Sequence, residues 1–194
     1  MGAESVTVCF TGNPNCGKTT LFNAYTGAGK KTANWPGVTV ALSEGSLMHR
    51  GRLVHLVDTP GIYSLDPYTM EETVTRQCIR DQKADVIIHV ADALLLERSL
   101  FLTMQLLAEG KPLVLALNMM DLVRERGMDI DIGRLSRLLG GIPVIPVSAR
   151  RRTGLEELMD AAVEAARARR MADGSGRFLS GARYSVYRSH SAHS

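Results

Sequence analysis

The sequence predicts an α/β fold of three layers, in which a mostly parallel six-stranded sheet with one antiparallel edge strand lies between about five helices. Two observations support this prediction. Apolar runs of strand length alternate along the chain with segments of helical period, and this alternation is typical of parallel sheets covered on both faces. The chain also has 194 residues, 45% of them apolar, so that one domain can bury a sizeable core.

The individual elements follow from the same pattern. Six segments are typical of strands: 6–12, 38–49, 52–59, 85–92, 111–118 and 142–148. The second and third are expected to form a strand pair that turns around residues 49–51. Four segments have apolar residues at helical spacing and are expected to be helices: 17–27, 98–110, 131–140 and 154–170. We expect one domain over residues 1–170 and a flexible tail or linker over 171–194, which is rich in Ser, Gly, Arg and His without a regular period.

Composition excludes several classes of function. The formal net charge is only +3, which is too small to indicate a nucleic-acid partner. The three cysteines are odd in number and scattered, so they are expected to be core residues or reduced thiols in a reducing cytosol. No run approaches the 18 or so consecutive apolar residues of a membrane span, and the N-terminus lacks the pattern of a signal peptide. We therefore expect a cytoplasmic protein.

A phosphate-binding loop is predicted at "GNPNCGKTT", which matches the pattern GxxxxGK(S/T) between a strand and a helix. Glycines in such a loop let backbone N–H groups point toward phosphates, and the helix N-terminus adds the positive end of its dipole. Lys18 is expected to reach the β- and γ-phosphates, and the Thr19 hydroxyl to ligate Mg²⁺. The expected phosphate-binding residues are Gly12, Asn13, Pro14, Asn15, Cys16, Gly17, Lys18, Thr19 and Thr20.

The base is predicted to be guanine. "NMMD" places Asn118 and Asp121 at the carboxyl end of a strand, where ligands bind in open α/β sheets. A carboxylate there accepts from the ring N–H and the exocyclic amine of guanine, whereas adenine would leave it unpaired. Met119 can cover an apolar face of the base. Ser148 and Ala149, in "VSAR", follow the last strand, and their backbone can close over the guanine carbonyl.

Two further segments are candidates for sensing the γ-phosphate. "DTPG" ends a strand, so that Asp58 can hold Mg²⁺ through water and the Gly61 N–H can bond the γ-phosphate. Thr39, in "NWPGVTV", is the candidate for a second Mg²⁺ ligand. Each short motif is common by chance or as a plain turn, and its weight comes from the order of all of them along the chain.

Together these motifs resemble the Ras-like P-loop GTPase fold, and more closely its translation-factor-related branch. "TANWPGVTV", "VDTPGIYSLDPYTMEE" and "LERSLFLTMQLLAEGKPLVLALNMMDL" resemble the cytosolic G domain of the FeoB family of ferrous-iron transport proteins, over about residues 4–170. The resemblance implies a GTP- and GDP-binding GTPase with switch segments near 30–40 and 58–72. It also implies a helical switch-contacting domain and a membrane iron channel as partners, neither found in this chain, a place at the inner face of the membrane, and oligomers through the full-length protein.

The resemblance also implies stimulation by K⁺. In potassium-activated GTPases of this kind, the phosphate-loop Asn helps to bind the cation together with carbonyls of the first switch, which here are Asn15 with Ala33 and Trp35. A cation there offsets charge that develops on the γ-phosphate. The implied catalytic residues are Asn15, Lys18, Thr39 and Gly61. The family often has Gly where this chain has Ala33, and a positive φ at that position would cost about 1 kcal/mol or more.

Ile62 stands where a Ras-type enzyme carries a water-positioning Gln. An aliphatic side chain cannot polarise water, so a slow intrinsic rate is expected and no side-chain general base can be named. Two alternatives therefore stay open. One is a guanine-nucleotide sensor with negligible turnover, and the other is a ribosome-assembly GTPase, which would need an RNA-binding domain or a basic face.

Overall fold

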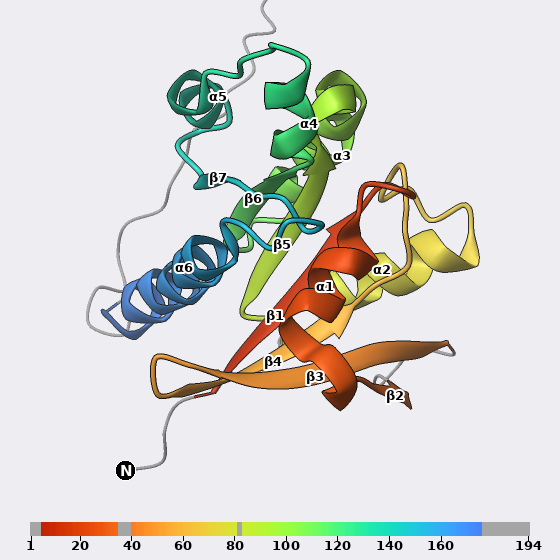
Figure 1. The fold of residues 1–194 in the computed structure, drawn as a ribbon. Coiled ribbons are helices and arrows are strands. Elements are labelled where there is room, and N and C mark those ends of the chain that lie inside the picture. Colours follow the sequence, from red (N-terminus) through yellow and green to blue (C-terminus); the bar gives the residue numbers. More distant parts are fainter. Residues whose placement is uncertain (1–4, 35–39, 81–82, 176–194) are drawn as a thin grey trace, which may run out of the picture.

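The computed structural model describes residues 5–34, 40–80 and 83–175. A single sheet of seven strands runs through this described part, in the order β2-β3-β4-β1-β5-β6-β7 (Figure 1). The strands are β1 (Val6–Gly12), β2 (Lys31–Asn34), β3 (Ala41–His49), β4 (Arg52–Asp58), β5 (Val86–Asp92), β6 (Leu113–Asn118) and β7 (Val144–Pro146). The α-helices are α1 (Lys18–Thr26), α2 (Met70–Arg80), α3 (Leu96–Ala108), α4 (Met120–Glu125), α5 (Ile132–Leu138) and α6 (Leu155–Ser175).

The central strands of the sheet are parallel. β1 pairs in parallel with β4 on one side and with β5 on the other, and β5, β6 and β7 continue the parallel order. Two pairings are antiparallel: β3 pairs with β4 as a hairpin, and β2 pairs with β3. Only β3 therefore runs against the other strands. The carboxyl ends of β1, β4, β5 and β6 therefore meet at one edge of the sheet, where the chain also carries its motifs.

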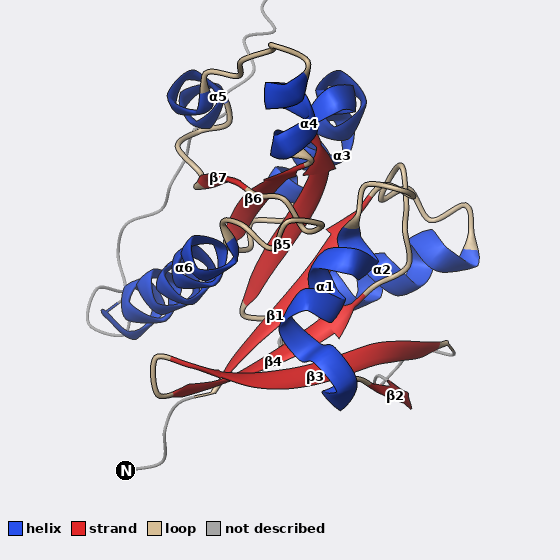
Figure 2. Cartoon of the chain, viewed as in Figure 1, coloured by secondary structure: helices blue, strands red, loops and turns tan. Residues whose placement is uncertain are grey.

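Helices cover both faces of the sheet (Figure 2). On one face, α1 and α6 pack their apolar side chains onto Phe10, Leu56 and Ile88. On the opposite face, α2 and α3 pack onto Val57 and Ile87. The apolar runs of the central strands supply core residues to both faces of the sheet, because parallel strands covered by helices on both sides are apolar throughout. The three cysteines are buried and free, as the sequence predicts.

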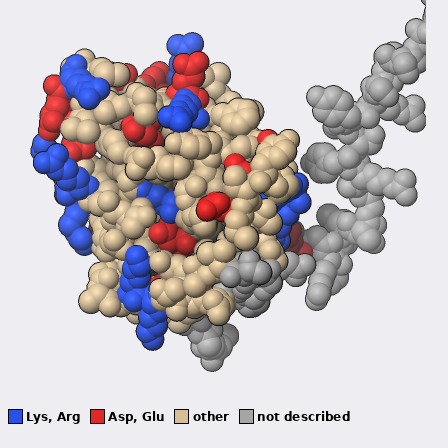
Figure 3. All heavy atoms as spheres, turned by 90° about the vertical axis from the view of Figure 1, so that its right-hand side faces the viewer, with Lys and Arg blue, Asp and Glu red and all other residues tan. Residues whose placement is uncertain are grey.

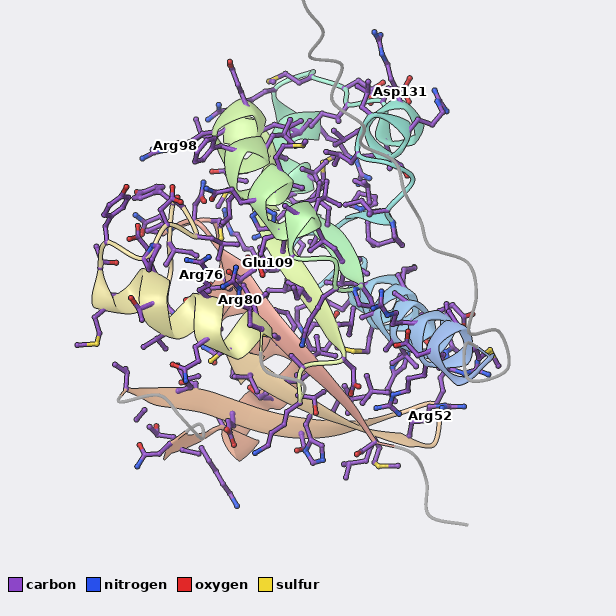
Figure 4. The ribbon with its side chains drawn as sticks, turned by 180° about the vertical axis from the view of Figure 1, so that it is seen from behind. Arg52, Arg76, Arg80, Arg98, Glu109 and Asp131 are labelled. Atoms are coloured by element: carbon purple, nitrogen blue, oxygen red, sulfur yellow. The ribbon has the colours of Figure 1, made fainter. Side chains whose placement is uncertain are left out.

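An ion pair joins the C-terminal ends of α2 and α3. Arg80 donates from Nε and Nη2 to the two carboxylate oxygens of Glu109, at 2.8 and 2.9 Å. The two side chains point toward each other from neighbouring helices, with Arg76 beside them (Figure 4). The Arg80 guanidinium holds the pKa of Glu109 below its usual value. This bidentate pair connects the C-terminal ends of the two helices.

The predicted α/β class is confirmed, together with the mostly parallel sheet and its antiparallel edge. The sheet has one strand more than the six expected. The additional strand is β2, whose largely exposed sequence "KTAN" lacks an apolar run. Two helices, α2 and α4, had no counterpart among the segments of helical period. The last helix continues to Ser175, past the expected domain end at residue 170, and residues 176–194 of the expected tail lie outside the described residues.

Candidate functional site

The predicted phosphate loop connects β1 to α1 in a tight turn. Asn15 and Gly17 have positive φ angles of 63° and 85°, and the Cys16 N–H donates to the Asn13 carbonyl at 3.3 Å. A Cβ atom on Gly17 would lie 2.2 Å from Nδ2 of Asn118, and one on Gly12 would lie 2.5 Å from the carbonyl oxygen of Val90. Glycine is therefore required at both positions for the loop to pack against its neighbours.

Lys18 and Asp58 are brought together at the floor of this loop. Lys18 is buried, and its ammonium group donates to Oδ1 of Asp58 and to the Thr59 carbonyl, the latter at 2.6 Å. Thr59 is held in turn by β1, because its N–H and its hydroxyl both donate to the Phe10 carbonyl, at 3.1 and 2.8 Å. The positive and negative charges thus neutralise each other in a buried setting, next to the site expected for phosphates and Mg²⁺.

A cavity of about 260 Å³ opens above this pair. Its lining residues are Asn13, Asn15, Gly17, Lys18, Thr19, Thr20 and Gly61. The Thr19 and Thr20 side chains are exposed at the first turn of α1. Asn13 is only 7% exposed, and its Oδ1 has no hydrogen-bond partner among the described residues. Hydroxyl, ammonium and backbone N–H groups around one hollow fit a polyphosphate with a bound divalent cation.

The segment after β4 passes directly over the phosphate loop. A Cβ atom on Gly61 would lie 3.2 Å from the Pro14 backbone, and the Ile62 N–H donates to the Gly12 carbonyl at 3.0 Å. The Ile62 side chain is 2% exposed and packs with Ile87 and other apolar residues of the core. It therefore points away from the phosphate cavity.

Helix α3 holds the same segment from its other side. The Gln105 Oε1 accepts from the Leu65 N–H at 2.8 Å, and its Nε2 donates to the Ser64 hydroxyl at 3.1 Å. The Arg98 guanidinium lies 4.4 Å from the centroid of the Tyr63 ring, and Figure 4 shows where Arg98 projects from α3. These contacts attach the predicted second switch segment to a helix of the core.

Asn118 connects three parts of the site. Its Nδ2 donates to the Cys16 carbonyl of the phosphate loop at 3.0 Å, and its Oδ1 accepts from the Ala149 N–H at 2.9 Å. Met119, the next residue, has a positive φ of 67°, which turns the chain from β6 into α4. One buried amide thus fixes the phosphate loop against the segment expected to cover the base.

Next to the phosphate cavity lies a second cavity of about 160 Å³. It is lined by Gly17, Thr20, Asn118, Met119, Asp121, Leu122, Ser148, Ala149 and Arg150. The Asp121 side chain is 9% exposed, and Arg151 approaches it with Nε 3.4 Å from Oδ2. Partial burial raises the pKa of Asp121, but the Ser148 hydroxyl, backbone N–H groups and Arg151 together hold this pKa below its usual value. The carboxylate is therefore charged and able to accept two N–H groups of a base.

Not every predicted site residue is brought to these cavities. Ala33 lies in β2, paired with Leu42, and lines a larger hollow of about 710 Å³ on the β2–β3–β4 part of the sheet. That hollow contains none of the phosphate-loop residues, so Ala33 and Asn15 line different cavities. Ala33 has no positive φ, so its replacement of Gly causes no backbone strain in this conformation. Trp35 and Thr39 lie outside the described residues.

Sequence reasoning missed several residues that build the site. Thr59 and Gln105 hold the second switch segment, Arg98 stacks on Tyr63, and Arg151 binds Asp121. Gln105, Arg98 and Arg151 belong to no recognisable nucleotide-binding pattern. Thr59 lies inside "DTPG", but its hydrogen bonds to Phe10 depend on the pairing of β4 with β1, which the motif does not show.

The fold and the two adjoining cavities define a P-loop protein of the G-domain class. Residues 6–162 match the model of the family described as ferrous iron transport protein B. The chain belongs to this family and corresponds to its N-terminal G domain.

Known relatives agree with this assignment. The chain is 47% identical over 151 residues to the Fe(2+) transporter FeoB of Legionella pneumophila (strain Paris), an alignment that covers 76% of this chain and 20% of the relative. Among solved structures, the cytosolic domain of the T. maritima FeoB iron transporter in a GDP form is 41% identical, with a TM-score of 0.81 over 86% of this chain and 65% of that chain. The cytosolic domain of L. pneumophila FeoB is 44% identical, with a TM-score of 0.76 over 82% and 63% of the two chains.

The chain spans about a fifth of the length of such full-length transporters, whose alignment covers 20% of the relative. In the part of the chain that the structure describes, no helix has the length and apolar character needed to cross a bilayer.

Proposed function

We propose that this domain binds GTP and hydrolyses it to GDP and phosphate, and that it acts as the nucleotide-controlled switch of a ferrous-iron transport system. The observation that carries the proposal is the pair of adjoining cavities, which share Gly17 and Thr20. One is lined by groups that bind phosphate, and the other contains a charged carboxylate suited to guanine. The GDP form of the T. maritima relative supports the same proposal.

On the phosphate side, the proposal requires the Lys18–Asp58 pair to separate. Lys18 then binds the β- and γ-phosphates, while Asp58, Thr19 and Thr39 are the residues that would hold Mg²⁺. A bound Mg²⁺ supplies neutralisation of charge on the phosphate oxygens. Because each member of the buried pair gains an opposite charge in the exchange, neither is left uncompensated.

On the base side, Asp121 accepts the two N–H groups of guanine. Asn118 contributes indirectly, since its amide positions the Ala149 N–H and the Cys16 carbonyl. Adenine offers no pair of donors to Asp121 and would cover this carboxylate without hydrogen-bonding it, which disfavours ATP.

Hydrolysis is expected to be slow without a partner or cation. Ile62 is turned into the core, so the attacking water has to be oriented by backbone groups such as the Gly61 N–H. We propose that Asn15 takes part in a K⁺ site, with carbonyls of the first switch segment as further ligands. A bound K⁺ would offset negative charge that develops on the γ-phosphate.

The nucleotide state is proposed to act through residues 30–40 and 58–72, with Thr39 as a ligand of Mg²⁺ and the Gly61 N–H as a donor to the γ-phosphate. Their readers would be the helical domain and the membrane iron channel of a full-length FeoB, at the inner face of the membrane, where oligomers could also form. No nucleic-acid partner is proposed. On the face seen in Figure 3, Lys and Arg lie among Asp and Glu, and residues of other kinds cover most of the surface, so this face is not the basic surface that an RNA partner needs.

A second candidate function is favoured by the burial of Ile62. With no side chain at this position to orient water, the domain could bind guanine nucleotides with negligible turnover and act as a sensor. The two candidates differ in phosphate release, not in nucleotide binding.

The deciding experiment measures phosphate release from GTP in KCl and in NaCl at matched ionic strength, for the wild type and Asn15→Ala. We expect K⁺ to accelerate release in the wild type and to have no such effect in Asn15→Ala, which should still bind GTP. Background rates in both salts with intact GTP binding would support the sensor instead.

The base assignment has its own test in Asp121→Asn. An amide in place of the carboxylate offers a donor where guanine also offers one, so preference should shift from guanine toward xanthine nucleotides by about a hundredfold or more. Competitive displacement of a fluorescent GDP by GDP and XDP measures this shift. Unchanged affinity for GDP would contradict the assignment.

A further inference from the structure

The loop that follows β7 is folded into a fixed shape. Ser148 and Thr153 exchange two backbone hydrogen bonds of 3.1 Å each, which close the loop at its base. Arg152 has a positive φ of 55°, and Gly154 one of 74°. A Cβ atom on Gly154 would lie 2.3 Å from the Pro146 carbonyl oxygen, so that only glycine fits there. The loop therefore presents Arg151 toward the two acidic residues of α4, Asp121 and Glu125.

Arg151 contacts two polar groups of the base pocket. Its backbone N–H donates to the Ser148 hydroxyl oxygen at 3.1 Å, and its guanidinium forms an ion pair with Asp121, with Nε 3.4 Å from Oδ2. The Ser148 hydroxyl and Arg151 are both among the groups that lower the pKa of Asp121. Backbone and side chain of one residue thus contact both polar groups.

Glu125 holds the outer side of the guanidinium. Nη2 of Arg151 is bonded to Oε1 of Glu125, which lies on α4 one turn after Asp121. Arg151 is 60% exposed and Asp121 9% exposed, so the arginine lies over the rim of the pocket and connects the buried carboxylate to an exposed one. An arginine with two carboxylate partners keeps its planar head in one orientation.

We propose that Arg151 is a positioning residue that aligns the Asp121 carboxylate for guanine, and that it thereby sets base selectivity and the residence time of the bound nucleotide. This inference rests on the proposed guanine-nucleotide function. A carboxylate accepts the ring N–H and the exocyclic amine together only in one rotation of its plane, and Arg151 with Ser148 fixes that rotation. Glu125 acts one step further out, by holding Arg151.

The test compares release of a fluorescent GDP and a fluorescent IDP from Arg151→Ala, with Arg124→Ala as the matched control. Inosine lacks the exocyclic amine, so its release depends less on the alignment of Asp121. Arg124 is an exposed arginine on α4 that is not among the residues lining either cavity. Thermal unfolding of each variant checks that the domain is folded.

For Arg151→Ala we expect GDP release about three- to tenfold faster, in keeping with the loss of a partly exposed ion pair and its orienting effect. IDP release should change less than about twofold, so that the discrimination between GDP and IDP falls. Arg124→Ala should match the wild type in both measurements. Arg151→Lys should recover only part of the discrimination, since an ammonium group cannot bind two carboxylates in a fixed plane.

Release of GDP from Glu125→Gln provides a second test, in which Arg151 itself is unchanged. We expect a smaller acceleration of GDP release, and no further acceleration when Glu125→Gln is combined with Arg151→Ala. The inference alone is overturned if the wild type binds GDP and Arg151→Ala behaves as Arg124→Ala does, or if GDP and IDP release accelerate equally. A wild-type domain that binds no guanine nucleotide overturns the proposed function and this inference with it.

Discussion

At the scale of single residues, Ile62 has the clearest functional consequence. The residue follows "DTPG" directly, within hydrogen-bond reach of the phosphate loop through its backbone, yet its side chain packs into the apolar interior. The backbone and the side chain of Ile62 therefore make different contacts. The N–H bonds the segment to Gly12, and the sec-butyl side chain packs against α2 and α3. A polar side chain at this position would have to leave the core before it could act on water.

Ile62→Gln is therefore expected to lower stability without gain in catalysis. The Gln side chain either keeps its amide buried or leaves the core and opens a cavity. In both cases the free energy of unfolding should fall by about 2–4 kcal/mol. Urea unfolding measures this loss, and phosphate release from GTP measures the rate. Ile62→Val, which keeps an apolar side chain, should cost about 1 kcal/mol and serves as the control. A stable Ile62→Gln variant with faster GTP hydrolysis would contradict the inward orientation of this side chain.

At the scale of elements, His89 joins β5 to α3 inside the molecule. The ring is fully buried, and its Nδ1 lies 3.0 Å from the Thr103 hydroxyl, while Nε2 has no hydrogen-bond partner among the described residues. Burial lowers the pKa of His89 to about 3. The imidazole is therefore neutral in the folded state, whereas in the unfolded chain it titrates near pH 6.5.

Stability should consequently fall as the pH drops below about 6.5. Between the unfolded pKa and the folded pKa of about 3, the unfolded state binds a proton that the folded state excludes. From pH 7 to pH 5, the wild type should lose about 2 kcal/mol more than His89→Asn does. Urea unfolding of both proteins at the two pH values measures this difference. The contributions of the other titrating groups to the pH dependence are the same in both proteins and cancel. Equal losses would mean that His89 is accessible to protons in the folded domain.

How far the elements could be predicted depends on where their apolar residues lie. β1 has the expected bounds because its residues are almost all buried, and the hairpin of β3 and β4 follows from its two apolar runs. β2 was missed because it is an exposed edge strand, held by backbone pairing with β3. α2 was missed because its mean composition is polar, although Thr69 and Glu72 form a capping box at its start.

The residues of the candidate site also differ in how far the sequence predicts them. The phosphate-loop pattern and "NMMD" could be identified because local geometry fixes both, through glycine and a strand end. The Lys18–Asp58 pair and the Asn118 bridge join segments far apart in the sequence. Their partners depend on the order of strands in the sheet, which short motifs do not encode.

At the scale of the whole molecule, the candidate site is the point where separate parts of the fold meet. The phosphate loop follows β1, Asp58 ends β4, Asn118 ends β6, and Ala149 lies after β7. A nucleotide in the two cavities would contact all four regions at once. Because the parallel sheet aligns the carboxyl ends of these strands, binding should stabilise the domain as a unit rather than one loop.

GDP should therefore raise the unfolding temperature of the domain. At a free GDP concentration about 100 times the dissociation constant, linkage gives about 2.7 kcal/mol, which for a domain of this size corresponds to an increase of about 5–10 °C. Differential scanning fluorimetry with GDP, ADP and no nucleotide measures the shift, and ADP should give little at equal concentration. In Asp121→Asn the GDP shift should largely disappear and an XDP shift should replace it. If ADP and GDP stabilise the wild type equally, the phosphate cavity alone accounts for binding, and Asp121 does not select the base.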